Sequence, residues 1–339
     1  MLRRWVKQGD SVEWFAAGFD GGAPETTIDG IHVVRAGHQW SVHAQAIRLY
    51  RGRLRDRFDV VIDEVNTMPF FTPLWAGIPS VLLMFQLARE VWWYESRFPI
   101  NLLGYGLEPW YLRPYRWTAA FTISQSTVDD LRRLGFRGPI TLVPIGIETI
   151  AAPSVERAPI PTFLYVGRLA PSKRVHDLLE AFSRFRTADE RARLWLVGDG
   201  DPAYLRRLRR LATRLRIDQE VEFLGRLDAD AKHRRMAQAN ALMVASVREG
   251  WGLVVTEAAA CGTPSIVYDV PGLRDAVRDE VTGLVVRPTP ADLAAAMRRL
   301  IQDPALAQRL GAAALEFSKT FSYDHSADVL RRGILARLS

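Results

Sequence analysis

The chain has 339 residues, of which 48% are hydrophobic and 24% are charged, enough apolar material for two ordinary α/β domains with separate cores. A single cysteine, Cys261, excludes an intrachain disulfide framework and fits a reducing, cytoplasmic compartment. The net charge of +7 favours an anionic partner, such as nucleic acid, an acidic membrane surface or a phosphorylated small molecule, unless it is only a solvated basic surface.

The opening residues, MLRRWVKQGD, lack the apolar core of a secretory signal, and prolines interrupt the most apolar stretch, residues 68–85. We therefore expect no membrane-spanning helix. The same opening looks like the end of a helix closed by Gly9, whereas an open α/β sheet ordinarily begins with a strand and a glycine-rich turn. The sequence predicts an N-terminal domain without its first strand, either permuted, trimmed or starting upstream.

Short apolar runs alternate with amphipathic stretches, a pattern typical of βαβ units around buried parallel sheets. Strands are predicted in the first half at residues 12–19, 31–35, 58–63, 80–85, 119–124 and 140–143. Strands are predicted in the second half at residues 162–166, 194–197, 221–224, 241–245, 265–268 and 284–286. Only helices follow, ending with one at about residues 323–338. The predicted fold class is α/β with two Rossmann-like domains.

A proline-rich segment separates the two halves. It reads IETIAAPSVERAPIP at residues 147–161, contains three prolines and shows no sustained periodicity, as is typical of an interdomain linker. The predicted division is an N-terminal domain at residues 1–150, a linker at 151–161, a C-terminal domain at 162–320 and a helical segment at 321–339.

The strongest chemical signal is a pair of glutamates around a glycine turn, in SVREGWGLVVTEAAACGTP at residues 246–264. Glu249 and Glu257 have seven residues between them, and Gly250 and Gly252 lie where a strand must turn into a helix. Such a turn exposes backbone N–H groups at the positive end of the helix. A diphosphate can therefore bind there without a metal.

The two carboxylates suit a ligand rich in hydroxyl groups, because each can accept two hydrogen bonds. Glu257, one turn into the helix, is placed to accept from a ribose, and Glu249, before the turn, is placed to reach a sugar. In the alternative interpretation, Glu249 caps the helix and Glu257 lies on a solvated face. The two glycines and the turn at residues 261–264 favour the ligand site.

These residues resemble the donor site of the family-4 retaining glycosyltransferases, where an E-x7-E element of this form occurs. The resemblance spans the second half of the chain and, more weakly, the first. It implies a glycosyltransferase-B fold of two facing Rossmann-like domains, with Glu249 near the transferred sugar and Glu257 on the ribose of a nucleotide diphosphate sugar. It assigns the donor to residues 162–320, the acceptor to residues 1–150, and a helix crossing back to the N-terminal domain to residues 321–339.

A second element of the family, VGRLAPSKR at residues 166–174, follows the first strand of the C-terminal domain. Arg168 and Lys173 lie five residues apart across a turn, and two cations converging there would neutralise a diphosphate in place of magnesium. The resemblance implies that these two residues and Glu249 form the catalytic group. The alternative is a basic loop followed by a helix that Ser172 caps.

Further matches to the family add mainly glycine and backbone positions to the implied donor site. The donor-binding residues are Gly167, Arg168, Lys173, Gly198, Arg226, Leu227, Glu249, Gly250, Trp251, Gly252, Leu253, Val254 and Glu257. LVGDGD at residues 196–201 imitates an Asp-x-Asp metal site, but it lies in a glycine turn at a strand end. We therefore predict neither a metal nor a cofactor.

The first half departs from the family at one position. A histidine often follows the strand that faces the donor sugar, whereas this chain has Phe85 and Gln86. Phe85 is interpreted as strand core, and Gln86 as a contact to a sugar or acceptor hydroxyl. The absent histidine leaves open a protein that binds donor but transfers weakly.

Residues 89–117 interleave tryptophans and tyrosines with several arginines. This composition suits a cradle for a lipid-linked or saccharide acceptor, a membrane interface that uses Trp92 and Trp93, or two helices packed on a sheet. A nucleic-acid platform is less favoured, because no recognised module accompanies it.

The predicted function is metal-independent, retaining transfer of a hexose from a nucleotide diphosphate sugar to a hydroxyl acceptor, which is a glycan, a lipid-linked molecule or a small molecule. Two other hypotheses remain: a donor-binding, catalytically weak partner subunit of another glycosyltransferase, and a nucleotide-sugar epimerase. The expected location is the cytoplasm, with or without peripheral contact to the inner membrane face, and no nucleic-acid partner is expected.

Overall fold

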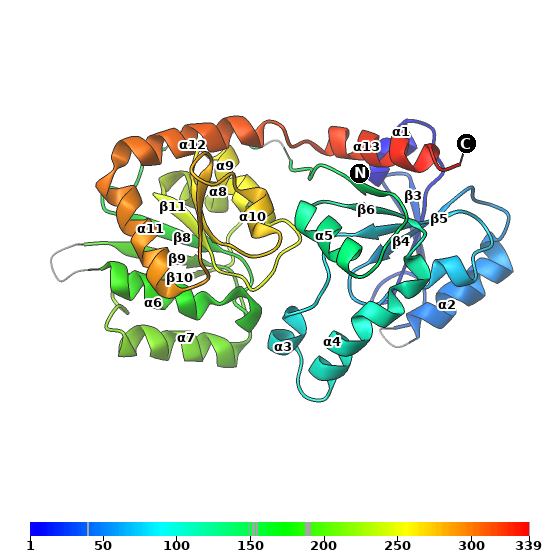
Figure 1. The fold of residues 1–339 in the computed structure, drawn as a ribbon, viewed down its shortest axis with the longest axis horizontal. Helices are drawn as coiled ribbons and strands as arrows, with labels where there is room; N and C mark the ends of the chain where they lie inside the picture. Colours follow the sequence, from blue (N-terminus) through cyan, green and yellow to red (C-terminus); the bar gives the residue numbers. More distant parts are fainter. Residues whose placement is uncertain (39–40, 149, 151–152, 154, 187–190, 339) are drawn as a thin grey trace. The chain divides into compact units, whose positions relative to one another are not determined.

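The structure is a computed structural model that describes residues 1–38, 41–148, 150, 153, 155–186 and 191–338. The chain forms two compact units (Figure 1). The N-terminal unit contains residues 1–87, 106–146 and 322–339, and the C-terminal unit contains residues 88–105 and 147–321. Part of the predicted linker, at residues 151, 152 and 154, lies outside the described residues.

The C-terminal unit is built on a six-stranded parallel sheet with the order β10-β9-β8-β11-β12-β13. Its strands are β8 (Thr162–Val166), β9 (Arg193–Val197), β10 (Val221–Gly225), β11 (Ala241–Val244), β12 (Ser265–Tyr268) and β13 (Gly283–Val286). Every strand predicted for this half is confirmed, with ends that differ by one residue at most.

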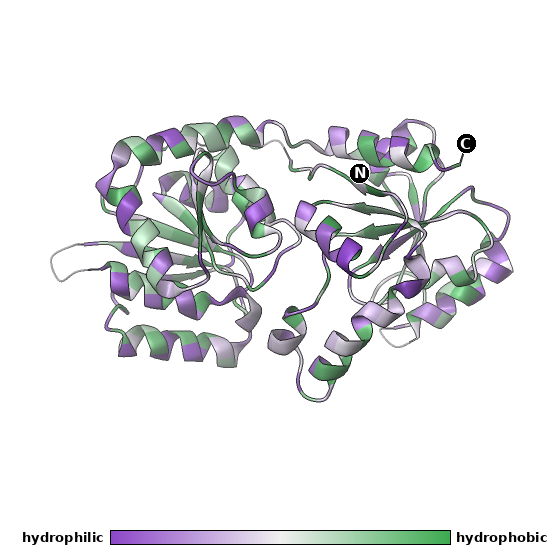
Figure 2. Ribbon diagram, in the orientation of Figure 1, coloured by the Kyte–Doolittle hydropathy of each residue, from purple (hydrophilic) through white to green (hydrophobic). Residues whose placement is uncertain are grey.

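Helices cover both faces of this sheet, since its strands place apolar side chains on each face in turn. In β8, Phe163 and Tyr165 join one core and Leu164 joins the other. The first core is covered by α6 (Val175–Phe185), α7 (Pro202–Arg214), α11 (Pro290–Gln302) and α12 (Pro304–Ser318), and the second by α8 (Ala229–Gln238), α9 (Leu253–Ala260) and α10 (Leu273–Ala276). The strands are accordingly apolar, and the helices are mixed in hydropathy (Figure 2).

The strand order reverses at β8, because β9 lies on one side of it and β11 on the other. Ligands of open α/β sheets bind outside the carboxyl ends of the strands at such a switch point. The loop that starts at Gly167 follows β8, and the loop with Glu249 follows β11. The fold therefore places the two predicted motifs at the ends of neighbouring strands.

The N-terminal unit has two separate sheets. One is parallel, with β4 (Val61–Val65), β5 (Ser80–Met84), β6 (Ala119–Thr122) and β7 (Ile140–Leu142) in chain order, and the other has the order β1 (Glu13–Ala16), β3 (Ile31–Arg35), β2 (Glu25–Ile28). Strand β2 was not predicted: it pairs antiparallel with β3 and is mostly exposed, so it lacks the apolar run of a buried strand. The predicted strand at residues 58–63 begins three residues later in β4.

Helices from both ends of the chain cover one face of the four-stranded sheet. Helix α1 (Leu2–Lys7) and helix α13 (Tyr323–Leu335) bury Trp5 and Leu330 against Val81 and Phe121. The indole of Trp5 donates to the carbonyl of Ala327 at 2.9 Å. The other face is covered by α5 (Gln125–Arg133) and the short helix η3 (Arg113–Tyr115), and the remaining elements of this unit are α2 (Val42–Leu49), η1 (Tyr50–Leu54) and η2 (Thr72–Leu74).

The segment at residues 88–105 differs from the expected division, because its contacts group it with the C-terminal unit. It contains α3 (Val91–Glu95), which packs on the short helix η4 (Pro171–Lys173), and the first half of α4 (Ile100–Tyr111). In the described part of the chain, no helix is long and apolar enough to cross a membrane.

Candidate active site

The loop after β8 is held closely against the loop after β9. The amide of Gly167 donates to the carbonyl of Val197 at 3.0 Å, and that of Leu169 donates to the carbonyl of Asp199 at 2.8 Å. A Cβ on Gly198 would lie 2.0 Å from the carbonyl oxygen of Gly167. Only glycine permits this approach, so the predicted Gly198 shapes the backbone beside the switch point.

The side chain of Tyr165 positions the backbone of Arg168. The buried Tyr165 hydroxyl donates a hydrogen bond to the Arg168 carbonyl at 2.8 Å. Burial, with the charge of Glu249 as a second cause, raises the pKa of the Tyr165 hydroxyl, which therefore stays protonated as a donor. The Arg168 guanidinium itself is 61% exposed and faces solvent, where a ligand can reach it.

Lys173 and Glu249, predicted from separate motifs, are in direct contact. The Lys173 Nζ donates to the Glu249 Oε1 at 2.6 Å, and the Ser246 hydroxyl donates to the same oxygen at 2.6 Å. The loops are also joined through the backbone, because the amide of Val247 donates to the Ser172 carbonyl at 2.9 Å. Both charged side chains are about one-fifth exposed and therefore accessible to a ligand.

The backbone of Glu249 is positioned by the turn after β12. The Glu249 amide donates to the carbonyl of Pro271 at 3.0 Å. The next residue, Gly272, has a φ of 83°, and a Cβ there would lie 2.0 Å from the Glu249 carbonyl oxygen. The orientation of Glu249 thus depends on a glycine 23 residues away in the sequence.

Helix α9 begins beside this carboxylate. Gly252, with a φ of 93°, is its N-cap residue, and no described side chain caps the helix. The Val255 N–H donates to the Gly252 carbonyl at 2.8 Å, so the N–H groups of Leu253 and Val254 are the ones left for an anion at the positive end of the helix. Within α9, the Glu257 carboxylate pairs with Lys232 of α8 at 2.7 Å and stays about one-quarter exposed.

Trp251, predicted to contact the donor, has its side chain committed elsewhere. Its indole N–H donates to the Thr256 hydroxyl at 2.9 Å, and its ring packs edge-on against Phe321 with centroids 5.5 Å apart. Its backbone, between Gly250 and Gly252, is what remains for a ligand. The Trp251 indole thus stabilises the conformation of the turn.

A carboxylate that sequence reasoning missed lies on the site. Glu95 of α3 pairs with Arg168, with 3.0 Å between Oε2 and Nη1, and its other oxygen accepts a hydrogen bond from the Ser172 hydroxyl. Glu95 therefore forms an ion pair with the cation to which a diphosphate was assigned. Its signal in the sequence was an acidic residue in the aromatic stretch at residues 89–117, without a spacing that points to Arg168.

A second ion pair fixes the other end of α3. The Glu90 carboxylate accepts a hydrogen bond from the buried Arg248 guanidinium at 2.7 Å. Burial alone would raise the pKa of Glu90, but the hydrogen bond and positive charge of Arg248 outweigh it and hold this pKa below its usual value. Two carboxylates thus attach α3 beside the predicted site.

Glu95→Gln should tighten binding of a nucleoside diphosphate, because the diphosphate no longer competes with a carboxylate for Arg168. An exposed ion pair contributes at most about 1 kcal/mol, so we expect a decrease in Kd of up to about fivefold. The measurement is calorimetric titration of the wild type and the variant with UDP, ADP and GDP. In an Arg168→Ala background the same substitution should have no effect, and an equal gain there would refute the competition.

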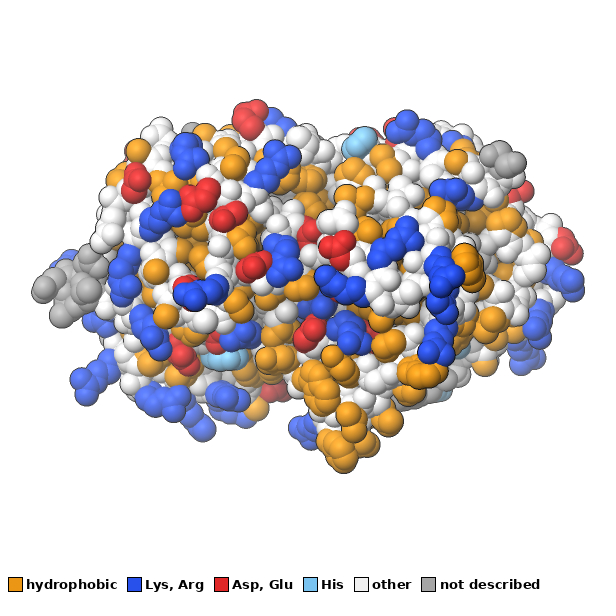
Figure 3. Space-filling view, viewed as in Figure 1, with side chains coloured by type: hydrophobic (Ala, Val, Ile, Leu, Met, Phe, Trp, Pro, Cys, Tyr) orange, Lys and Arg blue, Asp and Glu red, His pale blue; other side chains and the backbone are white. Residues whose placement is uncertain are grey.

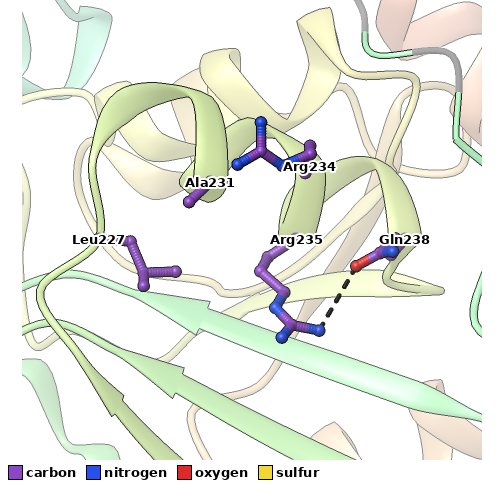
Figure 4. Close-up of a pocket in the computed structure, with 5 residues that line it drawn as sticks. All are labelled: Leu227, Ala231, Arg234, Arg235 and Gln238. Atoms are coloured by element: carbon purple, nitrogen blue, oxygen red, sulfur yellow. Dashed lines mark hydrogen bonds between the residues drawn. The ribbon is translucent and has the colours of Figure 1, made fainter.

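The remaining predicted donor residues lie after β10. Leu227 lines a hollow of about 280 Å³ with Ala231, Arg234, Arg235 and Gln238 of α8 (Figure 4). The Arg235 guanidinium turns toward Gln238, donating at 3.5 Å. This hollow includes Leu227 but not the charged groups of the β8 and β11 loops. Arg226, the residue before it, is exposed.

The Asp-x-Asp segment at residues 199–201 has a structural role. The Asp201 carboxylate accepts hydrogen bonds from the amides of Ala203 and Tyr204, at 2.9 and 3.0 Å, and so caps α7. Across the described residues, no group of three or more histidine, cysteine, aspartate or glutamate side chains is placed to hold a metal ion.

Gln86, the predicted contact from the first half, follows β5 in the N-terminal unit. Its Oε1 atom is buried and has no hydrogen-bond partner among the described residues. Phe85 beside it packs against the core that contains Val81, and its carbonyl accepts from the Thr127 hydroxyl at 3.1 Å. The Gln86 amide is thus a buried polar group without a protein partner for its oxygen.

The doubly wound sheet and its polar groups at the switch point define an α/β protein built to bind a ligand at the carboxyl ends of its strands. Residues 147–317, about half of the chain, match the family described as glycosyl transferases group 1. The chain belongs to this family.

Curated relatives support the same class. The chain is 34% identical over 216 residues to the glycogen synthase of Mycobacterium tuberculosis, covering 62% of this chain and 51% of that protein. It is 37% identical over 172 residues to a D-inositol 3-phosphate glycosyltransferase of Streptomyces bingchenggensis, covering 48% of this chain and 38% of that protein. The matches therefore span about half of one relative's length and 38% of the other's.

Solved structures share the fold over nearly the whole chain. The sucrose-phosphate synthase of Thermosynechococcus elongatus matches with a TM-score of 0.77 and 23% identity, covering 99% of this chain and 90% of that one. HepE of Anabaena, solved with UDP and glucose, matches with a TM-score of 0.72 and 19% identity, covering 91% and 87%. The predicted α/β fold of the glycosyltransferase-B type is confirmed.

Proposed function

We propose that the protein transfers a hexose from a nucleotide diphosphate sugar to a hydroxyl acceptor, with retention and without a metal. The observation that carries the proposal is the convergence of Arg168, Lys173, Glu249 and the uncapped start of α9 at one switch point. Membership of the glycosyl transferases group 1 supports the reaction class. The complex of HepE with UDP-glucose supports a donor of this kind.

The cations and the helix end suit a leaving diphosphate. Arg168 and Lys173 would compensate the negative charge that grows as the bond from the anomeric carbon to the phosphate oxygen breaks. The first N–H groups of α9 would add hydrogen bonds to the same phosphate. These groups supply the charge that magnesium supplies elsewhere, which is the basis for proposing a metal-independent site.

The two glutamates would orient the donor. Glu249 would accept hydrogen bonds from sugar hydroxyls, and Glu257, whose carboxylate is held by Lys232, would accept from the ribose. In a front-face transfer, the acceptor oxygen forms its bond on the face that the phosphate leaves. The departing phosphate oxygen takes the acceptor proton, so the anomeric configuration is retained.

The acceptor belongs, in this proposal, to the N-terminal unit. Gln86 offers a buried amide oxygen without a partner, which suits a hydroxyl of the sugar or of the acceptor. The acceptor class remains a glycan, a lipid-linked molecule or a small molecule. The single cysteine favours a cytoplasmic location.

The test is a thermal-shift and hydrolysis screen of the purified protein against nucleotide diphosphate sugars, in EDTA and with added magnesium. We expect one donor to stabilise the protein and to be hydrolysed slowly, equally well with and without the metal. Glu257→Ala should abolish the stabilisation, because the ribose loses its acceptor. Activity that requires magnesium would contradict the metal-independent site.

The same screen separates the other two hypotheses. Stabilisation by a donor without hydrolysis or transfer to any acceptor would favour a donor-binding partner subunit. The absence of the family's histidine at residues 85 and 86 motivates this hypothesis. A second nucleotide sugar in the product mixture, formed without an acceptor, would favour an epimerase.

A further inference from the structure

Helix α4 presents an apolar face to solvent. Ile100, Leu103, Leu107 and Trp110 recur at the three- and four-residue spacing that places side chains on one face of a helix, and each is more than half exposed. Phe98, just before the helix, is 78% exposed. Hydrophobic side chains gather in the space-filling view where α3 and α4 lie in the ribbon (Figure 3).

The opposite face of α4 is directed to the protein and is the more polar of the two. Glu108 on that face is buried, and Gly104 lies so close to Trp92 that a Cβ there would be 2.4 Å from the indole ring. A surface helix normally has the reverse arrangement. The two units divide between Tyr105 and Gly106, within the single continuous helix α4.

The apolar face is flanked by positive charge. Arg97 lies before α4 and Arg113 follows it; both are exposed, and neither has an ion pair with a described carboxylate. The Arg113 guanidinium lies 3.6 Å from the centroid of the Trp110 ring. The nearby acids Glu90 and Glu95 are neutralised by Arg248 and Arg168.

We infer that this face, defined as Phe98, Ile100, Leu103, Leu107 and Trp110, docks the protein on an anionic lipid surface. A helix with aliphatic and aromatic side chains outward and arginines at its ends inserts the former among acyl chains and holds the latter at lipid phosphates. Charge complementarity selects anionic lipid, since the exposed Arg97 and Arg113, which pair with no described carboxylate, flank the face. Of the two tryptophans suggested by the sequence, Trp92 packs on Gly104 and is outside this face, and Trp93, 46% exposed, packs on the Tyr105 ring.

The test is co-sedimentation with vesicles of phosphatidylcholine alone and of phosphatidylcholine with roughly 30% phosphatidylglycerol. The wild type should bind the anionic vesicles and be released by about 0.5 M salt to the level seen with neutral vesicles. The variant Leu103→Asp/Leu107→Asp should lose at least about tenfold in partition coefficient. The variant Arg97→Gln/Arg113→Gln should lose the preference for anionic vesicles.

Val281→Asp is the matched control, because Val281 is also about half exposed and lies in a turn of the C-terminal unit. It should bind vesicles as the wild type does. Unchanged thermal unfolding of the α4 variant would show that it folds. The proposal is overturned if the wild type does not bind anionic vesicles, or if the α4 variant binds them equally well. It is also overturned if the wild type forms a dimer that the α4 variant disrupts, the control variant does not, and neither the wild type nor the control binds vesicles. The proposal does not depend on the transfer reaction, since its test needs neither donor nor acceptor.

Discussion

Replacing Arg168 or Lys173 with alanine should reduce the rate of hexose transfer by at least about 100-fold, because each removes a positive charge from the departing diphosphate. The loss should fall mainly on kcat, since the charge that these residues compensate grows as the bond breaks. Steady-state kinetics with the donor found in the screen measure it. Arg168→Lys should retain part of the activity, because it keeps the charge and loses the planar fork.

The control for these variants is Arg299→Ala. Arg299 is also an exposed, ion-paired arginine of the C-terminal unit, but its partner is Glu280, outside the β8 and β11 loops. We expect unchanged kinetics. If Arg168→Ala or Lys173→Ala transfers hexose at the wild-type rate while Arg299→Ala does too, the assignment of the phosphate site is wrong.

Gly272→Ala should lower the free energy of unfolding by about 3 kcal/mol or more and remove the response to donor. The residue has a φ of 83°, which alone disfavours a side chain, and the new Cβ would lie 2.0 Å from the Glu249 carbonyl oxygen. The backbone must shift there, and Glu249 shifts with it. Urea denaturation and thermal shift with donor measure the two effects.

Gly262→Ala separates the strain of a positive φ from the crowding of a new Cβ against a neighbouring backbone. Gly262 has a similar φ of 70°, but a Cβ there would meet nothing within 4 Å. Its cost should be limited to about 1 kcal/mol, the strain of the left-handed backbone. Equal losses in the two variants would show that crowding at Glu249 is absent.

The sheet of the C-terminal unit could be predicted because its strands are buried on both faces and therefore appear as short apolar runs. Strand β12, with the sequence SIVY, is fully buried in this way. Strand β2 could not be predicted, since Glu25–Ile28 is mostly exposed and is stabilised by antiparallel pairing with β3. Its pairing depends on a neighbouring strand, which local composition does not report.

The loops of the candidate site could be predicted to the extent that their requirements are local. Gly252 is needed because a strand turns into α9 there with a positive φ, and this need is visible in the sequence. The contact of Lys173 with Glu249 joins residues 76 positions apart and could be expected only through the resemblance to a family. The structure adds the distance and the shared Ser246 hydroxyl.

The contact of Glu95 with Arg168 was predicted neither by the sequence pattern nor by the resemblance to the family. It lies 73 positions from Arg168, on a short helix without a periodic signal, and reaches the site only because α3 packs on η4. Trp251 illustrates the opposite case. The resemblance places Trp251 in the donor site, whereas the structure shows its indole hydrogen-bonded to Thr256 and packed on Phe321.

The most direct test of the donor site is a crystal structure of the protein with the nucleoside diphosphate of the donor identified in the screen, grown in EDTA. We expect phosphate oxygens within hydrogen-bond distance of Arg168, Lys173 and the first N–H groups of α9, with the ribose on Glu257 and with Glu95 displaced from Arg168. A diphosphate bound away from the β8 and β11 loops, or bound there without contact to either cation, would contradict it.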